Sequence, residues 1–111
     1  MLDFADLLQR CSQDRKTGLV NATVLQSSRF PVRIYFLDGN IIRLSYGPLY
    51  NQECLDLLQY YDLGRAMYVD GVKAPVNMSN VPSTQNIISS IRDMNKTIRL
   101  DQWIEGRVLT R

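Results

Sequence analysis

Two runs of alternating apolar and polar residues, joined by an Asp-Gly turn signal, constrain the fold of this chain more than any other feature. Apolar residues occupy alternate positions over 30–36 and 42–46, with Asp38-Gly39 between the runs. Such alternation is typical of β-strands that bury one face, and an Asp-Gly pair is typical of a hairpin turn. A similar run over 17–26 precedes them. The sequence therefore predicts a three-stranded antiparallel meander.

The register of the hairpin follows if both strands keep their apolar residues on one face. A two-residue Asp38-Gly39 turn would pair Ile34 with Arg43, which would put an arginine into the core. A three-residue Leu37-Asp38-Gly39 turn, with its glycine left-handed as a bulge, instead pairs Ile34 with Ile42. We therefore predict the three-residue turn.

This register places two arginines on the outer face of the sheet. Arg33 would lie directly opposite Arg43, flanked by a pair formed by Tyr35 and Ile41. Arginine and tyrosine contribute strongly to protein interfaces, so these four residues are a candidate docking patch for an acidic, partly apolar partner surface. The alternative is that the arginine stems lie across the sheet, with their head groups solvated or paired with a nearby aspartate.

Helical spacing of other apolar residues predicts three helices. The first is capped by Asp3 and reaches about Ser12, the second covers about 51–61, and the third is capped by Ser83 and reaches about Asn95. Each carries its apolar residues along one side, so we expect the helices to pack on one face of the sheet.

The remaining segments complete the predicted fold. We expect a short fourth strand at 65–69 and, because the stretch is rich in Pro, Asn and Ser, an extended loop over 72–82. Residues 96–111 are too apolar for a disordered tail, so we expect packed structure of unspecified type there. The predicted class is α+β: a small antiparallel sheet of four strands with helices on one face, forming a domain over 1–95, and a C-terminal extension over 96–111 packed on it.

Composition argues against most catalytic and metal chemistry. The chain has no histidine, the commonest general base and zinc ligand. Cys11 and Cys54 lack metal-site spacing and fall on apolar helical faces, so we expect free thiols in the core. We therefore expect no catalytic residue, no metal and no cofactor, and a protein that is not an enzyme.

The segment Arg15-Lys16-Thr17-Gly18 is a second candidate for binding an anion. The spacing of a phosphate-binding loop is missing, and the order is helix then strand, whereas phosphate loops place backbone amides at the start of a helix. The alternative is that the glycine permits a tight entry into the strand while Arg15 and Lys16 neutralise the C-terminal dipole of the preceding helix.

Several short segments, taken in order, resemble one family. They run from the first helix to the start of the third: Phe4–Gln9, Arg15–Val20, Ile34–Ile42, Tyr46-Gly47, Glu53 with Leu55, Leu57 and Leu58, Gly64-Arg65, and Ser83-Thr84. Together they resemble the PATAN-like bacterial signalling domains of unknown function, over most of the chain. The chain departs from that pattern in an expanded turn at Gln26–Phe30 and in an extra segment after Met94.

The resemblance implies an adaptor function. PATAN-like domains occur beside response-regulator receiver domains and in proteins tied to gliding, pilus-based motility and small-GTPase polarity systems, and no catalytic residue is established for them. We therefore expect a non-enzymatic protein-protein interaction module of the bacterial cytoplasm, whose partner is a response-regulator, motility or small-GTPase component.

Charge and hydropathy bear on three other kinds of partner: nucleic acid, a second copy of the chain and a membrane. A nucleic-acid-binding module using Arg33, Tyr35 and Arg43 is the alternative function, but a net charge of +2, from 13 Lys and Arg against 11 Asp and Glu, is small for duplex binding. A homodimer could form if the short fourth strand leaves a free sheet edge. The apolar runs are only a few residues long and the chain starts with acidic residues, so we expect neither membrane insertion nor a signal peptide.

Overall fold

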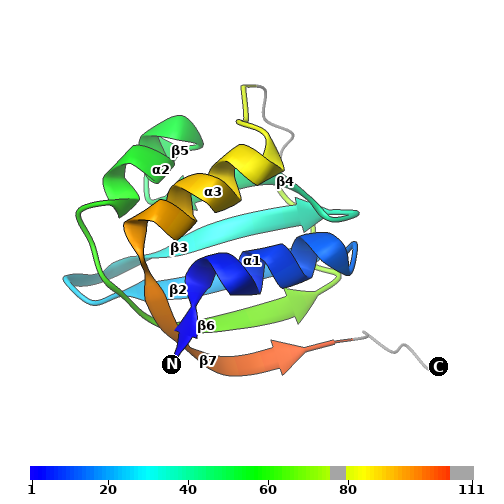
Figure 1. The fold of residues 1–111 in the computed structure, drawn as a ribbon, viewed down its shortest axis with the longest axis horizontal. Helices are drawn as coiled ribbons and strands as arrows, with labels where there is room; N and C mark the ends of the chain where they lie inside the picture. The colour runs from blue at the N-terminus through cyan, green and yellow to red at the C-terminus, as the bar shows by residue number, and fades with distance from the viewer. Residues whose placement is uncertain (76–79, 106–111) are drawn as a thin grey trace.

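A seven-stranded, mostly antiparallel sheet and three helices make up the computed structural model, which describes residues 1–75 and 80–105 (Figure 1). The strands follow the spatial order β1-β7-β6-β2-β3-β4-β5, and β6 and β7 are parallel. The α+β class is confirmed, but the sheet is larger than the four strands predicted. The elements are β1 (Leu2–Asp3), α1 (Phe4–Gln13), β2 (Gly18–Val24), β3 (Ser27–Leu37), β4 (Asn40–Tyr46), β5 (Leu49–Tyr50), α2 (Gln52–Leu58), β6 (Leu63–Asp70), α3 (Thr84–Met94) and β7 (Thr97–Ile104).

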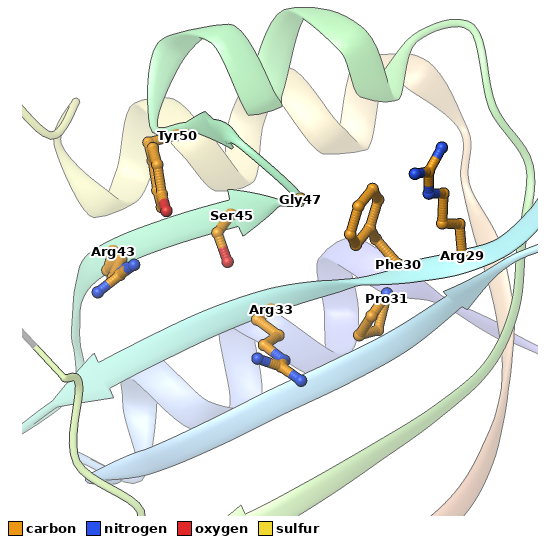
Figure 2. A pocket seen from close by; sticks show the side chains of 8 residues that line it. All are labelled: Arg29, Phe30, Pro31, Arg33, Arg43, Ser45, Gly47 and Tyr50. Atoms are coloured by element: carbon orange, nitrogen blue, oxygen red, sulfur yellow. The ribbon is translucent and has the colours of Figure 1, made fainter.

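The helices begin where their caps predict. The Asp3 carboxylate accepts a hydrogen bond from the Ala5 amide at 3.0 Å to start α1, and the Ser83 hydroxyl accepts one from the Asn86 amide at 3.2 Å to start α3. α1 and α3 lie side by side over one face of the sheet (Figure 1), and α2, shorter than predicted, packs at the β4–β5 end. Within the described residues, no helix covers the opposite face of the sheet (Figure 2).

The β3–β4 hairpin differs from the predicted register. A two-residue turn, Asp38-Gly39, joins the strands, and both residues have positive φ, 49° and 85°, as a type I′ turn requires. A bulge follows at Ile42, which has no register partner in β3. The predicted three-residue turn is therefore wrong. The extra residue lies in β4, as the bulge. Beyond the bulge, Leu44 pairs with Ile34, and both residues face the core.

The turn between β2 and β3 is tighter than predicted. Val24 pairs with Ser27, which leaves two residues in the turn. The Gln26 side chain donates to the Asp62 carboxylate at 3.1 Å and accepts from the Asp62 amide at 2.9 Å. The expanded turn predicted at Gln26–Phe30 is therefore wrong, because these contacts with the segment before β6 hold a short connection.

The C-terminal segment is part of the sheet itself. Residues 97–104 form β7, which lies between β1 and β6 and buries Ile98 completely. The predicted fourth strand is β6, and it has hydrogen-bonded neighbours on both sides. The free edge expected there for a homodimer therefore does not exist. Residues 76–79 of the predicted loop and 106–111 of the predicted extension lie outside the described residues.

Candidate functional site

The structure assembles the predicted docking patch only in part. Arg33 and Arg43 both project from the sheet face opposite α1 and α3, the face toward the viewer in Figure 2. Arg33 pairs with Ser45, and Arg43 pairs with Tyr35, so the two arginines are diagonal neighbours. The predicted Arg33–Arg43 pairing is wrong, because the two-residue turn and the bulge in β4 each shift the register by one residue. Diagonal positions lie about 7–8 Å apart, within reach of two long side chains.

The apolar members of the patch are not exposed. Ile41 is 4% exposed and lies opposite Phe36 in the core, and its amide donates a hydrogen bond to the Thr84 hydroxyl at 2.9 Å. Tyr35 faces outward but is only 7% exposed. The predicted surface pair of Tyr35 and Ile41 is therefore wrong, since the bulge turns the isoleucine to the other face of the sheet.

Arg15 and Lys16 form ion pairs within the chain. The Arg15 guanidinium donates two hydrogen bonds to the Asp38 carboxylate, at 3.0 and 2.5 Å, and holds the pKa of that carboxyl below its usual value. Lys16 Nζ donates to Glu105 Oε1 at 2.9 Å, and this hydrogen bond raises the pKa of the lysine. The structure does not bring either cation into the pocket that Arg33 lines.

The arginines divide into two groups by their partners. Of the eight that the structure describes, Arg10, Arg15 and Arg92 form ion pairs with carboxylates of the chain. The other five have no carboxylate partner among the described residues, and all five are on strands: Arg29, Arg33, Arg43, Arg65 and Arg99. These five residues are termed the arginine face.

The arginine face lies on the side of the sheet that no described helix covers. Arg33, Arg65 and Arg99 are exposed and each adjoins a buried residue of its strand, so they point away from the core. Arg65 and Arg99 are register partners in β6 and β7. Asp101 is the acidic residue among the described strand residues whose side chains lie on this face. It lines a groove together with Arg65. Among the described strand residues, the guanidinium groups of Arg33, Arg43, Arg65 and Arg99 therefore outnumber the single carboxylate on this face.

Arg43 lines a pocket on this face (Figure 2). The residue is 9% exposed, and its Nε and Nη1 atoms are buried without a hydrogen-bond partner in the described part of the chain. Its guanidinium carbon lies 4.9 Å from the centre of the Tyr50 ring and 6.0 Å from that of Tyr35. The pocket has a volume of about 340 Å³, and Arg29, Arg33 and Ser45 also line it.

Local structure holds the Tyr50 ring beside the buried guanidinium. Gly47, with a φ of 59°, lets the chain turn back after β4, so that Tyr50 in β5 pairs with Ser45. The Asn51 side chain then accepts from the Leu44 amide at 3.1 Å, and the Asn51 amide donates to the Leu44 carbonyl at 2.9 Å. The backbone at Tyr50 is therefore held in place, and its side chain lines the pocket.

A buried guanidinium without a counter-charge favours an anionic ligand. Removing a charged group from water costs free energy unless hydrogen bonds or an opposite charge compensate. The two tyrosine rings beside Arg43 supply only cation-π attraction, about 0.5–2 kcal/mol. An anion in the pocket would add the missing negative charge beside the guanidinium.

The sequence patterns place Arg33 and Arg43 on the outer face but not Arg65, Arg99 or Tyr50. The hairpin alone defines the predicted outer face, and residues 97–104 have no clean strand periodicity, so neither Arg65 nor Arg99 is assigned to it. A local signal marks both arginines. Arg65 precedes Ala66 and Arg99 follows Ile98, and each of these apolar neighbours is buried. No sequence pattern predicts the position of Tyr50, because the residue lies in a strand of only two residues.

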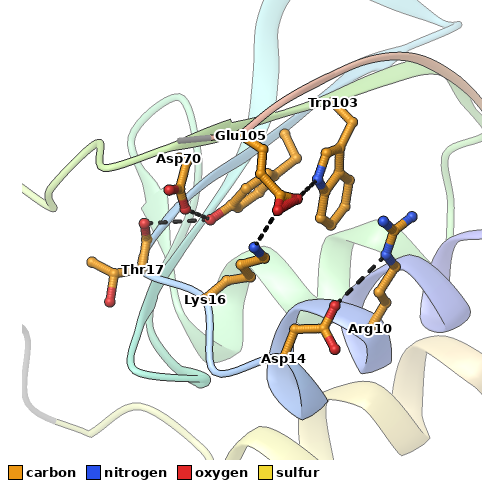
Figure 3. A network of polar contacts seen from close by, with 8 residues as sticks. Arg10, Asp14, Lys16, Thr17, Asp70, Trp103 and Glu105 are labelled. Carbon is orange, nitrogen blue, oxygen red and sulfur yellow. Dashed lines mark hydrogen bonds and ion pairs between the residues drawn. The ribbon is translucent and has the colours of Figure 1, made fainter. Parts of the chain in front are cut away.

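A separate polar cluster anchors the end of β7 (Figure 3). The rings of Trp103 and Tyr68 have centres 4.5 Å apart, and the Arg10 guanidinium carbon lies 3.9 Å from the centre of the Trp103 ring. Lys16 and the Trp103 indole both donate to the Glu105 carboxylate. These contacts connect α1 and the α1–β2 connection to the end of β7, so the cluster has a structural role.

Other side chains with potential chemistry do not form a site. Cys11 and Cys54 are buried free thiols, as predicted, and burial raises the pKa of each to about 12. Over 1–75 and 80–105, no three His, Cys, Asp or Glu residues gather in a way that could hold a metal ion. None of the described helices combines the length and the apolar character needed to span a membrane.

No family model, no curated protein and no solved structure matches this chain. The resemblance to the PATAN-like domains therefore stays a prediction based on the segments quoted above. A functional conclusion depends on the arginine face itself.

Proposed function

We propose that this protein is a non-enzymatic interaction module that binds an acidic surface of a partner protein through the arginine face. One observation carries the proposal: the described arginines on helices and turns have carboxylate partners, and those on the open face of the sheet have none. An unpaired guanidinium can form bidentate hydrogen bonds with a carboxylate without first breaking an internal ion pair. The arginine face is therefore complementary in charge to an acidic surface.

A protein partner is favoured over nucleic acid by the lack of a stacking surface. Sheets that bind single strands present exposed aromatic rings to the bases. Here Tyr35 is buried, and Tyr50, 36% exposed, lies against the Arg43 guanidinium. Nucleic acid is therefore the alternative, and the experiment below tests it.

The resemblance to PATAN-like domains supports a biological setting for this binding. We propose an adaptor role in bacterial signal transduction or in motility and polarity control. The partner would then be a response-regulator, motility or small-GTPase component that presents a cluster of Asp and Glu residues.

Binding of a labelled Asp- and Glu-rich peptide, followed by fluorescence anisotropy, tests the proposal. The test variant is R65Q/R99Q, which removes two unpaired charges of the arginine face outside the pocket. The control is R15Q/R92Q, which removes two charges that have internal partners. We expect about tenfold weaker binding in the test variant, since each exposed charge pair contributes about 0.2–1 kcal/mol, and little change in the control.

Three outcomes would contradict the proposal. Equal losses in the two variants would mean that only net charge matters. Tighter binding of a single-stranded or duplex oligonucleotide of equal length, with an affinity that falls steeply with salt, would favour the nucleic-acid alternative. Failure of the wild-type protein to bind the acidic peptide at low salt would remove the arginine face as a binding surface.

A further inference from the structure

We propose that the pocket at Arg43 binds a phosphate monoester carried on a side chain of the partner protein, as in phosphoserine. This inference rests on the proposed function and specifies which group of the acidic partner enters the pocket.

The buried donor is the Arg43 guanidinium. A guanidinium has five N–H donors in a planar fork, yet Nε and Nη1 of Arg43 have no acceptor among the described residues. Tyr50 and Tyr35 present ring faces to the guanidinium and do not accept hydrogen bonds from it. The site is built, because the Gly47 turn and the β4–β5 pairing hold the arginine and the tyrosine in place.

The groups around Arg43 are cations and hydroxyls. Arg33 is exposed at the pocket without a carboxylate partner in the described structure, and the Ser45 side chain lies directly across the ladder from it (Figure 2). Arg29 lines the pocket as well. Because Arg33 and Arg43 are diagonal neighbours, both can reach one oxygen-rich group. The described residues that line the pocket include no acid that would compete for these donors.

Charge favours a phosphate monoester over a carboxylate. A phosphate monoester carries about −1.5 to −2 charges at pH 7 and three acceptor oxygens, whereas a carboxylate carries one charge and two oxygens. One carboxylate would neutralise only one of the guanidinium groups at the pocket, and a phosphate neutralises two. Clusters of arginines are a recurring mode of recognising phosphorylated side chains. A volume of about 340 Å³ is also enough for one such group.

The experiment uses one acidic peptide in three forms, with serine, glutamate or phosphoserine at its centre, together with inorganic phosphate as a competitor. We expect the phosphoserine form to bind at least about tenfold more tightly than the glutamate form, and inorganic phosphate to bind more weakly than either. R43Q should abolish the difference between the phosphoserine and glutamate forms. R99Q, which removes a charge of the same face outside the pocket, should weaken all three forms by the same factor. R33Q, at an exposed position, should also reduce the difference, and it serves if R43Q does not fold.

Each contrary result is distinct. Equal binding of the glutamate and phosphoserine forms would overturn the phosphate inference and leave the proposed function standing. No binding of any form would overturn both. Inorganic phosphate that binds as tightly as the phosphopeptide would show that the ligand is the free anion. A phosphoserine preference that survives in both R43Q and R33Q would place the site elsewhere.

Discussion

Replacing Arg43 with Met should stabilise the protein while it removes the proposed anion site. The substitution keeps an unbranched side chain of similar length, so it can fill the space between Tyr35 and Tyr50. It removes a charged group that is nine-tenths buried and has two nitrogen atoms without partners in the described structure. Loss of stability is the usual result of a core substitution, so a gain would be diagnostic.

The size of the gain follows from the contacts of the guanidinium. Two buried donors without acceptors cost about 2 kcal/mol at the lower end of the usual range. The cation-π contact with Tyr50, at 4.9 Å, returns about 1 kcal/mol, and Tyr35, at 6.0 Å, is at the limit of such contacts. R43M should therefore raise the free energy of unfolding by about 1 kcal/mol, or the melting temperature by about 4 °C.

Urea denaturation and calorimetry of R43M, with R99M as the control, measure this difference. R99M removes an exposed charge without a partner on the same face, so its stability should stay within about 0.5 kcal/mol of the wild type. A loss of more than about 1 kcal/mol in R43M would refute the reasoning, because it would mean that the guanidinium is well compensated and contributes to the fold.

Three further predictions concern the fold. G39A should lower the free energy of unfolding of the protein by about 1–3 kcal/mol in urea denaturation, because the φ of Gly39 is +85° and an added Cβ would lie 2.6 Å from the Ser12 carbonyl oxygen. A change below about 0.5 kcal/mol would argue against the two-residue turn. S83A should cost about 1 kcal/mol through loss of the α3 cap, and no loss would contradict the cap assignment. Burial raises the thiol pKa of Cys11 and Cys54 from 9.0 to about 12, so these thiols lose their protons at a lower pH in the unfolded chain than in the folded one. Their contribution to stability is therefore complete below pH 9 and is lost as the pH rises toward 12. A thiol reagent at pH 8 should then label them only on unfolding, and rapid labelling of the native protein would contradict their burial.

Local signals predicted the local structure well. The cap at Asp3 and the cap at Ser83 each depend on one side chain and one nearby amide, and both are present. The alternation of Val20, Ala22 and Val24 likewise placed one face of β2 in the core. These features depend on residues close in sequence, so a single chain contains the information that specifies them.

The hairpin register could not be derived from the same signals. Two arrangements keep the apolar faces together: an extra residue in the turn, or a two-residue turn with an extra residue in the strand. The chain adopts the second, because Asp38-Gly39 fits a type I′ turn and the bulge at Ile42 restores the phase. No pattern at Ile42 distinguishes a bulge from regular strand, so the choice depends on tertiary contacts.

The part of the candidate site that lies on the β3–β4 pair could be predicted from the sequence. Arg33 and Arg43 face outward in either register, so their place on the open face was correctly expected. Arg65 joins them because β6 pairs with β2, and Arg99 joins them because β7 returns through α3 to pair in parallel with β6. Both pairings are contacts between distant segments. The pocket adds Tyr50, whose position depends on a turn at Gly47.

The most direct test of the account is a two-dimensional ¹H–¹⁵N spectrum of the protein titrated with the acidic peptide, including the arginine side-chain Nε–H signals. The account predicts that the shifts concentrate on β3, β4, β6 and β7 and on the arginine face, while the amides of α1 and α3 that face solvent stay unchanged. Shifts that concentrate on those two helices, or no shifts at saturating peptide, would contradict the central claim that unpaired arginines make the open side of the sheet a binding surface.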